Sequence, residues 1–320
     1  MISVAMCTFN GEKYIKEQIE SIINQSLVPD EIVICDDCSK DNTINIIKET
    51  LANWSGKANL IINEDNLGYR KNFEKAISLC NGDIIFLSDQ DDVWDNCKVE
   101  ILLKTFEKDK NIILAFHDVE VVDESLKVLS KSFWKILNFD YLTFEENNYK
   151  RLMESNVIQG SACAFKKELF NYAYPFPKTA VHDEWIGLVA ILNGKVLPVK
   201  KRLAKYRQSE NNVIGATEIS FIEKIKKWVI NVYKTANDYK AEIKRRYLLF
   251  KILKIKFPRK FNYNIHEINE YHIFLEERNT FINNKKYFKI LLNLDYIKIC
   301  GKNIYTLKIM LKDFITAFIS

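Results

Sequence analysis

Three groups of acidic residues stand where predicted strands end or a predicted helix begins. Asp36-Asp37 follows the apolar run 31–35, Asp89-Gln90-Asp91-Asp92 follows the run 83–87, and Asp183-Glu184 opens a predicted helix over 183–192. Carboxylates that converge on one edge of a sheet repel each other unless a cation balances them. A divalent ion shared with a diphosphate would supply that balance, because Mg²⁺ combines a few carboxylates with water and phosphate oxygens.

Each acidic group also has a purely structural interpretation. Asp36-Asp37 would form a turn before a helix that residues 41–43 cap. Residues 89–92 would form a second solvated turn, although carboxylates directly after a fully apolar strand make this the weakest of the three alternatives. For Asp183 taken alone, a helix-terminal charge stabilised by the helix dipole is the favoured interpretation.

The elements that would position these groups alternate along the first half of the chain. Strands are expected over 2–7, 31–35, 58–63, 83–87 and 112–116, and helices over 12–25, 41–51, 69–80 and 95–107. Short apolar strands separated by amphipathic helices indicate an α/β fold with a mostly parallel, doubly wound sheet. Ligands bind such sheets beyond the carboxyl ends of the strands, which is where the acidic groups fall.

The remaining sequence is less regular and then becomes helical. Between 118 and 215 we expect a Pro-broken stretch at 174–177, the helix over 183–192 and two short strands near 195–207. From about 220 onward apolar residues recur at helical spacing, and Pro258 is expected to end that helix. Residues 265–320 are expected to form further amphipathic helices.

The net charge of +5 is unevenly distributed. Residues 1–200 carry 22 Lys+Arg and 31 Asp+Glu, a net of −9, whereas residues 201–320 carry 25 and 11, a net of +14. An acidic region suits a cation, and a basic region suits phospholipid headgroups or a lipid diphosphate. The alternative for the basic helices is a solvated helical cap. A nucleic-acid interface is disfavoured, because the first part is acidic and no recognition motif is present.

Cysteine usage and the amino terminus predict a cytoplasmic protein. Met1 leads directly into a strand-like run without a signal-peptide pattern, and the seven cysteines are scattered. Cys35 and Cys38 form one C-x-x-C, which lacks the two further ligands of a zinc site, so buried small residues are the favoured interpretation. No apolar run approaches the ~18 residues of a membrane span, so at most a peripheral position at the inner face of the plasma membrane is expected.

Six short motifs follow one another along residues 1–216. They are Cys7-Thr8-Phe9-Asn10-Gly11, the run from Glu31 to Ser39, Asn66-Leu67-Gly68, the run from Ser88 to Trp94, His182-Asp183-Glu184-Trp185, and Tyr206-Arg207-Gln208 with 211–215. Together they resemble the inverting family 2 glycosyltransferases with the Rossmann-like GT-A fold. The run from Ser88 to Trp94 is similar to the D-x-D motif of the rhamnosyltransferase-like bacterial branch.

This resemblance implies a domain organisation and an activity. Residues 1–216 would form the GT-A domain. The charge and helical spacing of residues 217–320 predict a separate basic α-helical region that docks on a membrane surface, a partner or a second copy. The enzyme would move a sugar, with dTDP-rhamnose favoured over UDP-hexoses, to a saccharide acceptor such as a lipid-linked one. Mg²⁺ or Mn²⁺ would be the cofactor, and the product would belong to a cell-surface polysaccharide.

The resemblance also implies a role for each matching residue. Asp183 would be the general base and Asp91 the metal ligand, with Asp89 near the metal or the ribose. Asp37 would bind the nucleotide base with Asp36 as its brace, and Arg207 would contact the diphosphate. The full set for the donor nucleotide is Thr8, Asn10, Asp36, Asp37, Asn66, Gly68, Asp89 and Arg207. Acceptor contacts would come from Trp94, Trp185 and Glu184, although both tryptophans are equally explained as core residues.

The chemistry of the residues agrees with these roles. A metal at Asp91 would stabilise charge on the leaving diphosphate, and one carboxylate base would activate the acceptor hydroxyl for a single in-line displacement with inversion. One departure is Ser209, which replaces a His of the similar branch and puts a third metal ligand in question.

Two other functions compete with the active transferase. A nucleotidyltransferase is disfavoured, because only one glycine follows the first strand. An inactive GT-A protein that stabilises another glycosyltransferase is the remaining alternative, against which the intact D-x-D motif and Asp183 count.

Overall fold

The computed structural model describes residues 1–145, 150–208, 232–263, 266–284, 309–310, 312–313 and 316. The chain divides into two compact units, one formed by Met1–Phe176 with Val181–Glu218 and the other by Pro177–Ala180 with Ile219–Ser320. The boundary expected at 216–217 lies outside the described residues, as do Ser209 and the motif at 211–215.

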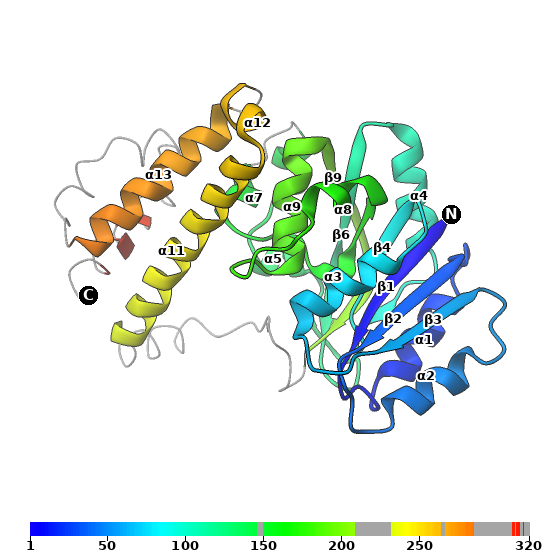
Figure 1. The fold of residues 1–320 in the computed structure, drawn as a ribbon. Coiled ribbons are helices and arrows are strands. Elements are labelled where there is room, and N and C mark those ends of the chain that lie inside the picture. Colours follow the sequence, from blue (N-terminus) through cyan, green and yellow to red (C-terminus); the bar gives the residue numbers. More distant parts are fainter. Residues whose placement is uncertain are drawn as a thin grey trace. The chain divides into compact units, whose positions relative to one another are not determined.

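The first unit is built on a nine-stranded sheet in the order β3-β2-β1-β4-β8-β6-β9-β5, with β7 paired to β6 (Figure 1). The strands are β1 (Ile2–Thr8), β2 (Glu31–Asp36), β3 (Lys57–Ile62), β4 (Ile84–Ser88), β5 (Val93–Trp94), β6 (Ile112–Val122), β7 (Val128–Ser130), β8 (Cys163–Lys166) and β9 (Lys195–Arg207). Strands β3, β2, β1 and β4 are parallel, β8 is antiparallel to β4 and β6, and β9 is parallel to β6. The expected α/β fold with a mostly parallel sheet is confirmed.

Strand β1 lies where the strand order reverses. The chain runs from β1 outward to β2 and β3, and then returns to place β4 on the other side of β1. The register pairs Thr8 with Asp36 and Met6 with Ser88, so the carboxyl ends of β2, β1 and β4 open onto one edge. Such a reversal point is where open α/β sheets bind ligands.

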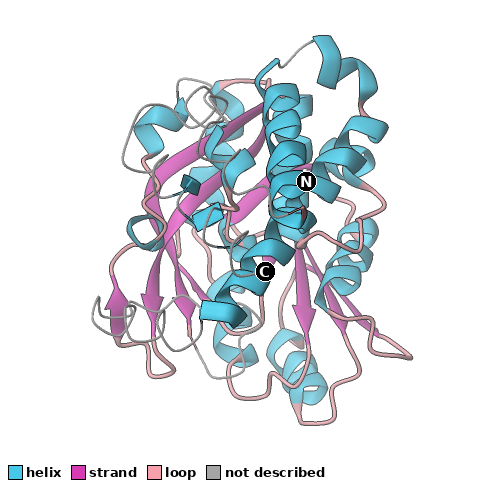
Figure 2. Cartoon of the chain, turned by 90° about the vertical axis from the view of Figure 1, so that its left-hand side faces the viewer, coloured by secondary structure: helices cyan, strands magenta, loops and turns pink. Residues whose placement is uncertain are grey.

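Helices cover both faces of this sheet, which explains why its strands are apolar on both sides (Figure 2). Helices α1 (Ile15–Ile23), α2 (Thr43–Leu51) and α4 (Lys98–Lys108) share a core with Val4, Met6 and other residues on one face. Helix α3 (Tyr69–Leu79) packs on β1 and β2, and α9 (His182–Asn193) packs on β6, β9 and α8 (Lys167–Ala173). The shorter helices are α5 (Phe133–Ile136), α6 (Tyr141–Glu145), α7 (Lys150–Glu154) and η1 (Gly160–Ala162).

Two strands in the middle of the chain, β9 and β6, have bounds that differ from expectation. The two short strands expected near 195–207 are one strand, β9, whose register against β6 shifts at three points without a break in the strand. Strand β6 continues to Val122, beyond the predicted end at 116, through the polar residues 117, 118 and 120. Asp118 is tolerated in a buried strand because its carboxylate accepts hydrogen bonds from Ser132 Oγ and Trp134 N.

The second unit contains the helices α11 (Val232–Lys256), α12 (Pro258–Tyr263) and α13 (His266–Asn283). As predicted, α11 ends just before Pro258. Helices α11 and α13 pack together, and a buried ion pair joins Arg278 to Asp313, to which the Tyr239 hydroxyl also donates. Among the helices that the structure describes, none is long and apolar enough to cross a membrane. The six cysteines within the described ranges are all free thiols.

Candidate active site

Asp36 ties the ends of β1 and β2 together. Its fully buried carboxylate accepts hydrogen bonds from Thr8 Oγ1 at 2.7 Å, from Ser39 Oγ at 2.6 Å and from Ser39 N at 2.8 Å. The loop after β1 is fastened to the same region, since Asn10 N donates to Ser39 Oγ and Lys40 N donates to the Asn10 side chain. Thr8 and Asp36 therefore form a framework, and the exposed Asn10 lies at its edge.

Asp37 holds the loop between β3 and α3. One carboxylate oxygen accepts from Asn63 Nδ2 and Leu67 N, and the other accepts from Gly68 N, at 2.7–2.8 Å. Gly68 has φ +74, a conformation in which a side chain would be strained, and Asn66 Nδ2 donates to the Asp37 carbonyl. The structure thus brings together Asp37, Asn66 and Gly68, three of the residues for which a contact with the donor nucleotide is predicted.

Gln90 joins the loop after β1 to the acidic loop after β4. Its amide oxygen accepts from Phe9 N at 2.8 Å, and its amide nitrogen donates to Phe9 O at 3.0 Å. A Cβ atom at position 11 would lie 2.3 Å from that amide oxygen, so Gly11 is required for this contact. The sequence placed Gln90 inside the acidic motif but gave it no role.

Asp89 and Asp91 are the two carboxylates of the site that remain open. Both are partly exposed, and neither carboxylate accepts a hydrogen bond from another residue in the described part of the chain. Burial, followed by the charges of Asp92, Asp91 and Asp183, holds the pKa of Asp89 well above its usual range. Burial and the charge of Asp92 raise the pKa of Asp91 to about 7. These two side chains would bind a cation at the expense of protons.

Asp92 has a structural role instead. It is fully buried, and its carboxylate accepts hydrogen bonds from Ser161 Oγ and from Arg207 N, the latter at 3.2 Å. The buried Lys98 ammonium donates to Ser161 O and lies 3.5 Å from the centre of the Trp94 ring. Burial lowers the pKa of Lys98 to about 7 against the opposing charges of Asp92 and Asp89. The sequence analysis missed Lys98 and Ser161, because a lysine in the first turn of an amphipathic helix gives no signal of burial.

Asp183 lies in the first turn of α9, close to the acidic loop. Its Oδ1 accepts from Asn156 Nδ2 at 2.9 Å and from Glu184 N at 2.6 Å. Burial is the main reason that the pKa of Asp183 rises to about 7. The charge of Asp183 in turn contributes to the raised pKa of Asp89. Two of the three predicted acidic groups therefore lie close enough for their charges to interact. Asn156 and Gly160 lie beside this carboxylate, and nothing in the sequence indicated that they belong to the site.

The residues predicted to touch the acceptor are all buried. The exposed fraction is 4% for Trp94, 0% for Trp185 and 2% for Glu184, and the Trp185 indole donates to Ala173 O. Neither tryptophan presents a ring face to a sugar, so the core interpretation replaces the acceptor role for both. Glu184 is buried as well, but so is Asp183 beside it, and its predicted contact with the acceptor stays a prediction.

Arg207 is predicted to contact a diphosphate, but its side chain forms hydrogen bonds within the protein. Its buried guanidinium donates to Asp91 O, Glu124 O and the Glu17 carboxylate, and it stacks over the Tyr14 ring at 4.4 Å. Contact with a diphosphate would require these hydrogen bonds to be exchanged. The structure therefore gives no support to the predicted direct contact.

A divalent cation is compatible with the open carboxylates. Within the described ranges no group of three or more His, Cys, Asp or Glu side chains is arranged as a metal site. Asp89 and Asp91 nevertheless offer unpaired carboxylates with raised pKa values. Two carboxylates leave positions for phosphate oxygens and water, which is the arrangement that Mg²⁺ prefers.

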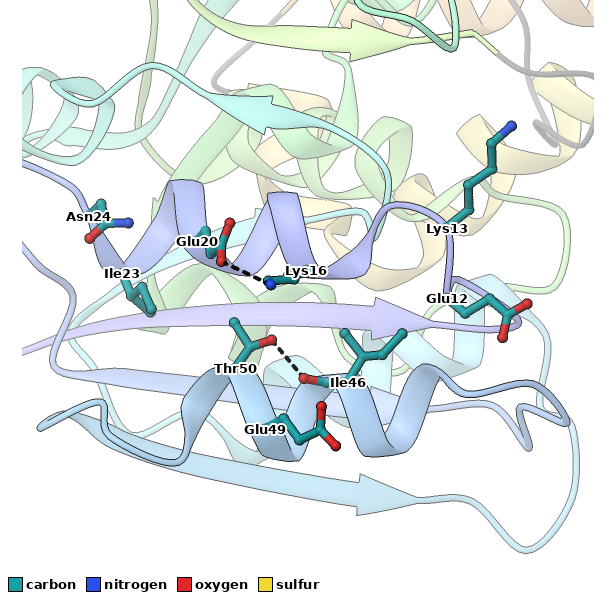
Figure 3. Close-up of a pocket in the computed structure, with 9 residues that line it drawn as sticks. All are labelled: Glu12, Lys13, Lys16, Glu20, Ile23, Asn24, Ile46, Glu49 and Thr50. Atoms are coloured by element: carbon teal, nitrogen blue, oxygen red, sulfur yellow. Dashed lines mark hydrogen bonds and ion pairs between the residues drawn. The ribbon is translucent and has the colours of Figure 1, made fainter.

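A groove of about 610 Å³ lies elsewhere, between α1 and α2 (Figure 3). Its lining mixes three glutamates and two lysines with apolar and amide residues, and Lys16 pairs with Glu20 across 3.9 Å. None of the predicted site residues lines it: the lining residues are Glu12, Lys13, Lys16, Glu20, Ile23, Asn24, Ile46, Glu49 and Thr50. Exposed pairs of this kind contribute little, and we assign the groove no part in the site.

Comparison with known proteins decides the family. The family described as glycosyl transferase family 2 matches residues 3–172, more than half of the chain. This chain belongs to glycosyl transferase family 2. The predicted family and the predicted glycosyltransferase activity are confirmed, and the matched region contains every acidic residue of the site except Asp183.

Individual relatives agree with this family. The dTDP-rhamnosyl transferase RfbG of Shigella flexneri is 30% identical over 230 residues, which cover 69% of this chain and 77% of that protein. A chondroitin synthase of Escherichia coli is 31% identical over 144 residues, covering 45% of this chain and 21% of the synthase. The fold is similar to that of S. aureus TarS 1–349 in complex with UDP, with a TM-score of 0.59 at 16% identity over 99% of this chain and 88% of that one. The GT-A fold is confirmed.

The Ser161 hydroxyl should matter for stability, because it satisfies a buried carboxylate. We expect Ser161→Ala to lower the free energy of unfolding by about 1–3 kcal/mol, since Asp92 would lose a buried hydrogen bond. Urea denaturation followed by circular dichroism measures this loss. Ser78→Ala, which removes a hydroxyl bound only to its own helix on the surface, is the matched control. Equal unfolding midpoints for both variants would contradict the structural role of Asp92.

Proposed function

We propose that this glycosyltransferase transfers a sugar from a nucleotide-sugar donor to a hydroxyl of a saccharide acceptor, with inversion at the anomeric carbon. Asp183 is the general base, and Asp91 with Asp89 holds Mg²⁺ or Mn²⁺ at the donor diphosphate. The observation that carries the proposal is the convergence of Asp183 with the open carboxylates of the acidic loop, at the edge where β2, β1 and β4 end.

The bond changes in this reaction balance with one base. The acceptor O–H gives its proton to Asp183, and the acceptor oxygen forms a bond to the anomeric carbon. The bond from that carbon to the diphosphate oxygen breaks, and its electron pair leaves with the nucleoside diphosphate. When bound, the cation supplies stabilisation of that negative charge. Asn156 Nδ2 and Glu184 N orient the Asp183 carboxylate for proton transfer.

The donor nucleotide is proposed to lie along the Asp37 loop. Asn10, Asp37, Asn66 and Gly68 border the same sheet edge, with Thr8 and Asp36 behind them. We favour dTDP-rhamnose because RfbG is a dTDP-rhamnosyl transferase. UDP-hexoses are the alternative, in view of the UDP in TarS, a protein that shares only the fold. The acceptor is proposed to be a growing cell-surface polysaccharide, and the cytoplasmic location stays a prediction.

Release of nucleoside diphosphate tests this function and its residues. We expect the full chain with Mn²⁺ to hydrolyse one donor of a panel of dTDP-rhamnose, UDP-glucose, UDP-galactose and UDP-N-acetylhexosamines. EDTA and Asp91→Asn should remove the activity. Asp183→Asn should slow sugar transfer by about 10²–10⁴-fold, because the acceptor would lose its base.

The matched control for these substitutions is Asp83→Asn. Asp83 is an exposed carboxylate at the other end of β4, where it pairs with the amino terminus. It should behave as the unchanged protein. An absence of both donor hydrolysis and metal-dependent nucleotide binding would instead support the inactive partner protein.

The pH dependence should report the protonation of Asp183. Its pKa is raised to about 7, and a base acts only when deprotonated, so the transfer rate should rise with pH through about 7 and then level off. Saturating Mn²⁺ keeps Asp91 ionised during the measurement. His182, whose pKa is lowered to about 3 by burial, stays neutral throughout. A rate that is constant from about pH 5 to 8 would rule Asp183 out as the base.

The basic helices are proposed to dock on an anionic membrane surface. Residues 251–260 contain five Lys or Arg and no acid, and Ile255 among them is 72% exposed. Each cation near an anionic leaflet contributes about 1 kcal/mol, and an exposed apolar side chain adds to this. A second copy of the chain and a solvated cap are the alternative uses of this surface.

Vesicle sedimentation tests this docking. The full chain should bind phosphatidylglycerol vesicles but not phosphatidylcholine vesicles, and high salt should release it. Lys251→Glu with Arg259→Glu should abolish binding. The control pair, Lys108→Glu with Lys110→Glu, changes the same charge on exposed residues of the first unit. Equal binding by both double variants would exclude this surface.

A further inference from the structure

Arg207, the last residue of β9, forms hydrogen bonds with the acidic loop over residues 89–92. Arg207 is 2% exposed, and Gln208 N donates to Val122 O, which fixes the end of β9 beside β6. Arg207 N donates to Asp92 Oδ1 at 3.2 Å, and its Nε donates to Asp91 O at 2.8 Å. One residue thus holds two consecutive residues of the loop and leaves the Asp91 carboxylate free.

The other side of the guanidinium is anchored to two further elements. Nη2 donates to the Glu17 carboxylate on α1 at 2.5 Å, and Nη1 donates to Glu124 O in the turn between β6 and β7 at 2.5 Å. The Tyr14 ring stacks on the guanidinium just before α1 begins. The planar fork of an arginine can make these contacts together, whereas the point charge of a lysine cannot.

We propose that Arg207 is a positioning residue, which with Glu17 fixes the backbone at Asp91 so that its carboxylate is held ready for the divalent cation. The inference rests on the proposed function and replaces the direct diphosphate contact that the sequence suggested. Groups that orient a metal ligand typically contribute 10–100-fold to metal affinity or activity. Glu17, whose side chain is 48% exposed, acts on the metal site only through Arg207.

The experiment compares Arg207→Lys and Glu17→Ala with the unchanged full chain. Calorimetry gives the affinity for dTDP and UDP without metal, and donor hydrolysis gives the Mn²⁺ concentration for half-maximal rate. Glu20→Ala is the matched control, because it removes a similar half-exposed glutamate one turn further along α1. Thermal melting checks that each variant folds.

We call the proposed action of Arg207 and Glu17 on the backbone at Asp91 the clamp. It predicts that Arg207→Lys and Glu17→Ala raise the Mn²⁺ concentration for half-maximal rate about tenfold or more, while metal-free nucleotide affinity stays the same. A direct diphosphate contact predicts the opposite pattern, in which Arg207→Lys weakens metal-free nucleotide binding and Glu17→Ala has no effect. That pattern, or a Glu17→Ala protein indistinguishable from Glu20→Ala, would overturn the inference.

The outcomes also separate this inference from the proposed function. If the unchanged chain shows no dependence on Mn²⁺, the proposed metal site fails and the clamp fails with it. If the unchanged chain depends on Mn²⁺ and both variants keep the same requirement, only the clamp fails. Should Arg207→Lys not fold, Glu17→Ala decides alone, since its side chain is half exposed.

Discussion

Mutual repulsion among carboxylates at one sheet edge is the constraint around which this structure is organised. The parallel strands β2, β1 and β4 direct their carboxyl ends to the same side, and each of β2 and β4 is followed by acidic residues. Together with Asp183 they concentrate negative charge in a partly buried region, where like charges interact strongly. The elements around the site determine which of these charges are balanced within the protein.

The carboxylates of the site fall into two groups, those that the protein satisfies with hydrogen bonds and those that it leaves open. Hydrogen bonds from Thr8, Ser39 and the 66–68 loop engage Asp36 and Asp37, while Ser161 and Arg207 N engage Asp92. Asp89 and Asp91 receive no such bonds from the described residues, and their pKa values are raised. A framework that satisfies some carboxylates and leaves others open is suited to holding a cation and a diphosphate at a defined place.

The sequence predicted the sheet, its helices and the acidic groups, because short apolar strands and the residues that follow them are local signals. It could not predict partners far apart in the chain. Ser161 binds Asp92 and Lys98 from 69 and 63 positions away, and Arg207 reaches Glu17 across 190 positions. Burial favours the core interpretation for Trp94 and Trp185, because a large side chain beside a motif gives the same sequence signal in the core and at the surface.

The most direct test of the account is the reciprocity of metal and nucleotide binding. Electron paramagnetic resonance of free Mn²⁺ measures the affinity of the full chain for the ion with and without dTDP or UDP. If Asp89 and Asp91 share the ion with the diphosphate, the nucleotide should tighten Mn²⁺ binding by about 5–150-fold, and Mn²⁺ should tighten nucleotide binding by the same factor. Nucleotide binding that is unaffected by Mn²⁺ would contradict a shared metal site at this sheet edge.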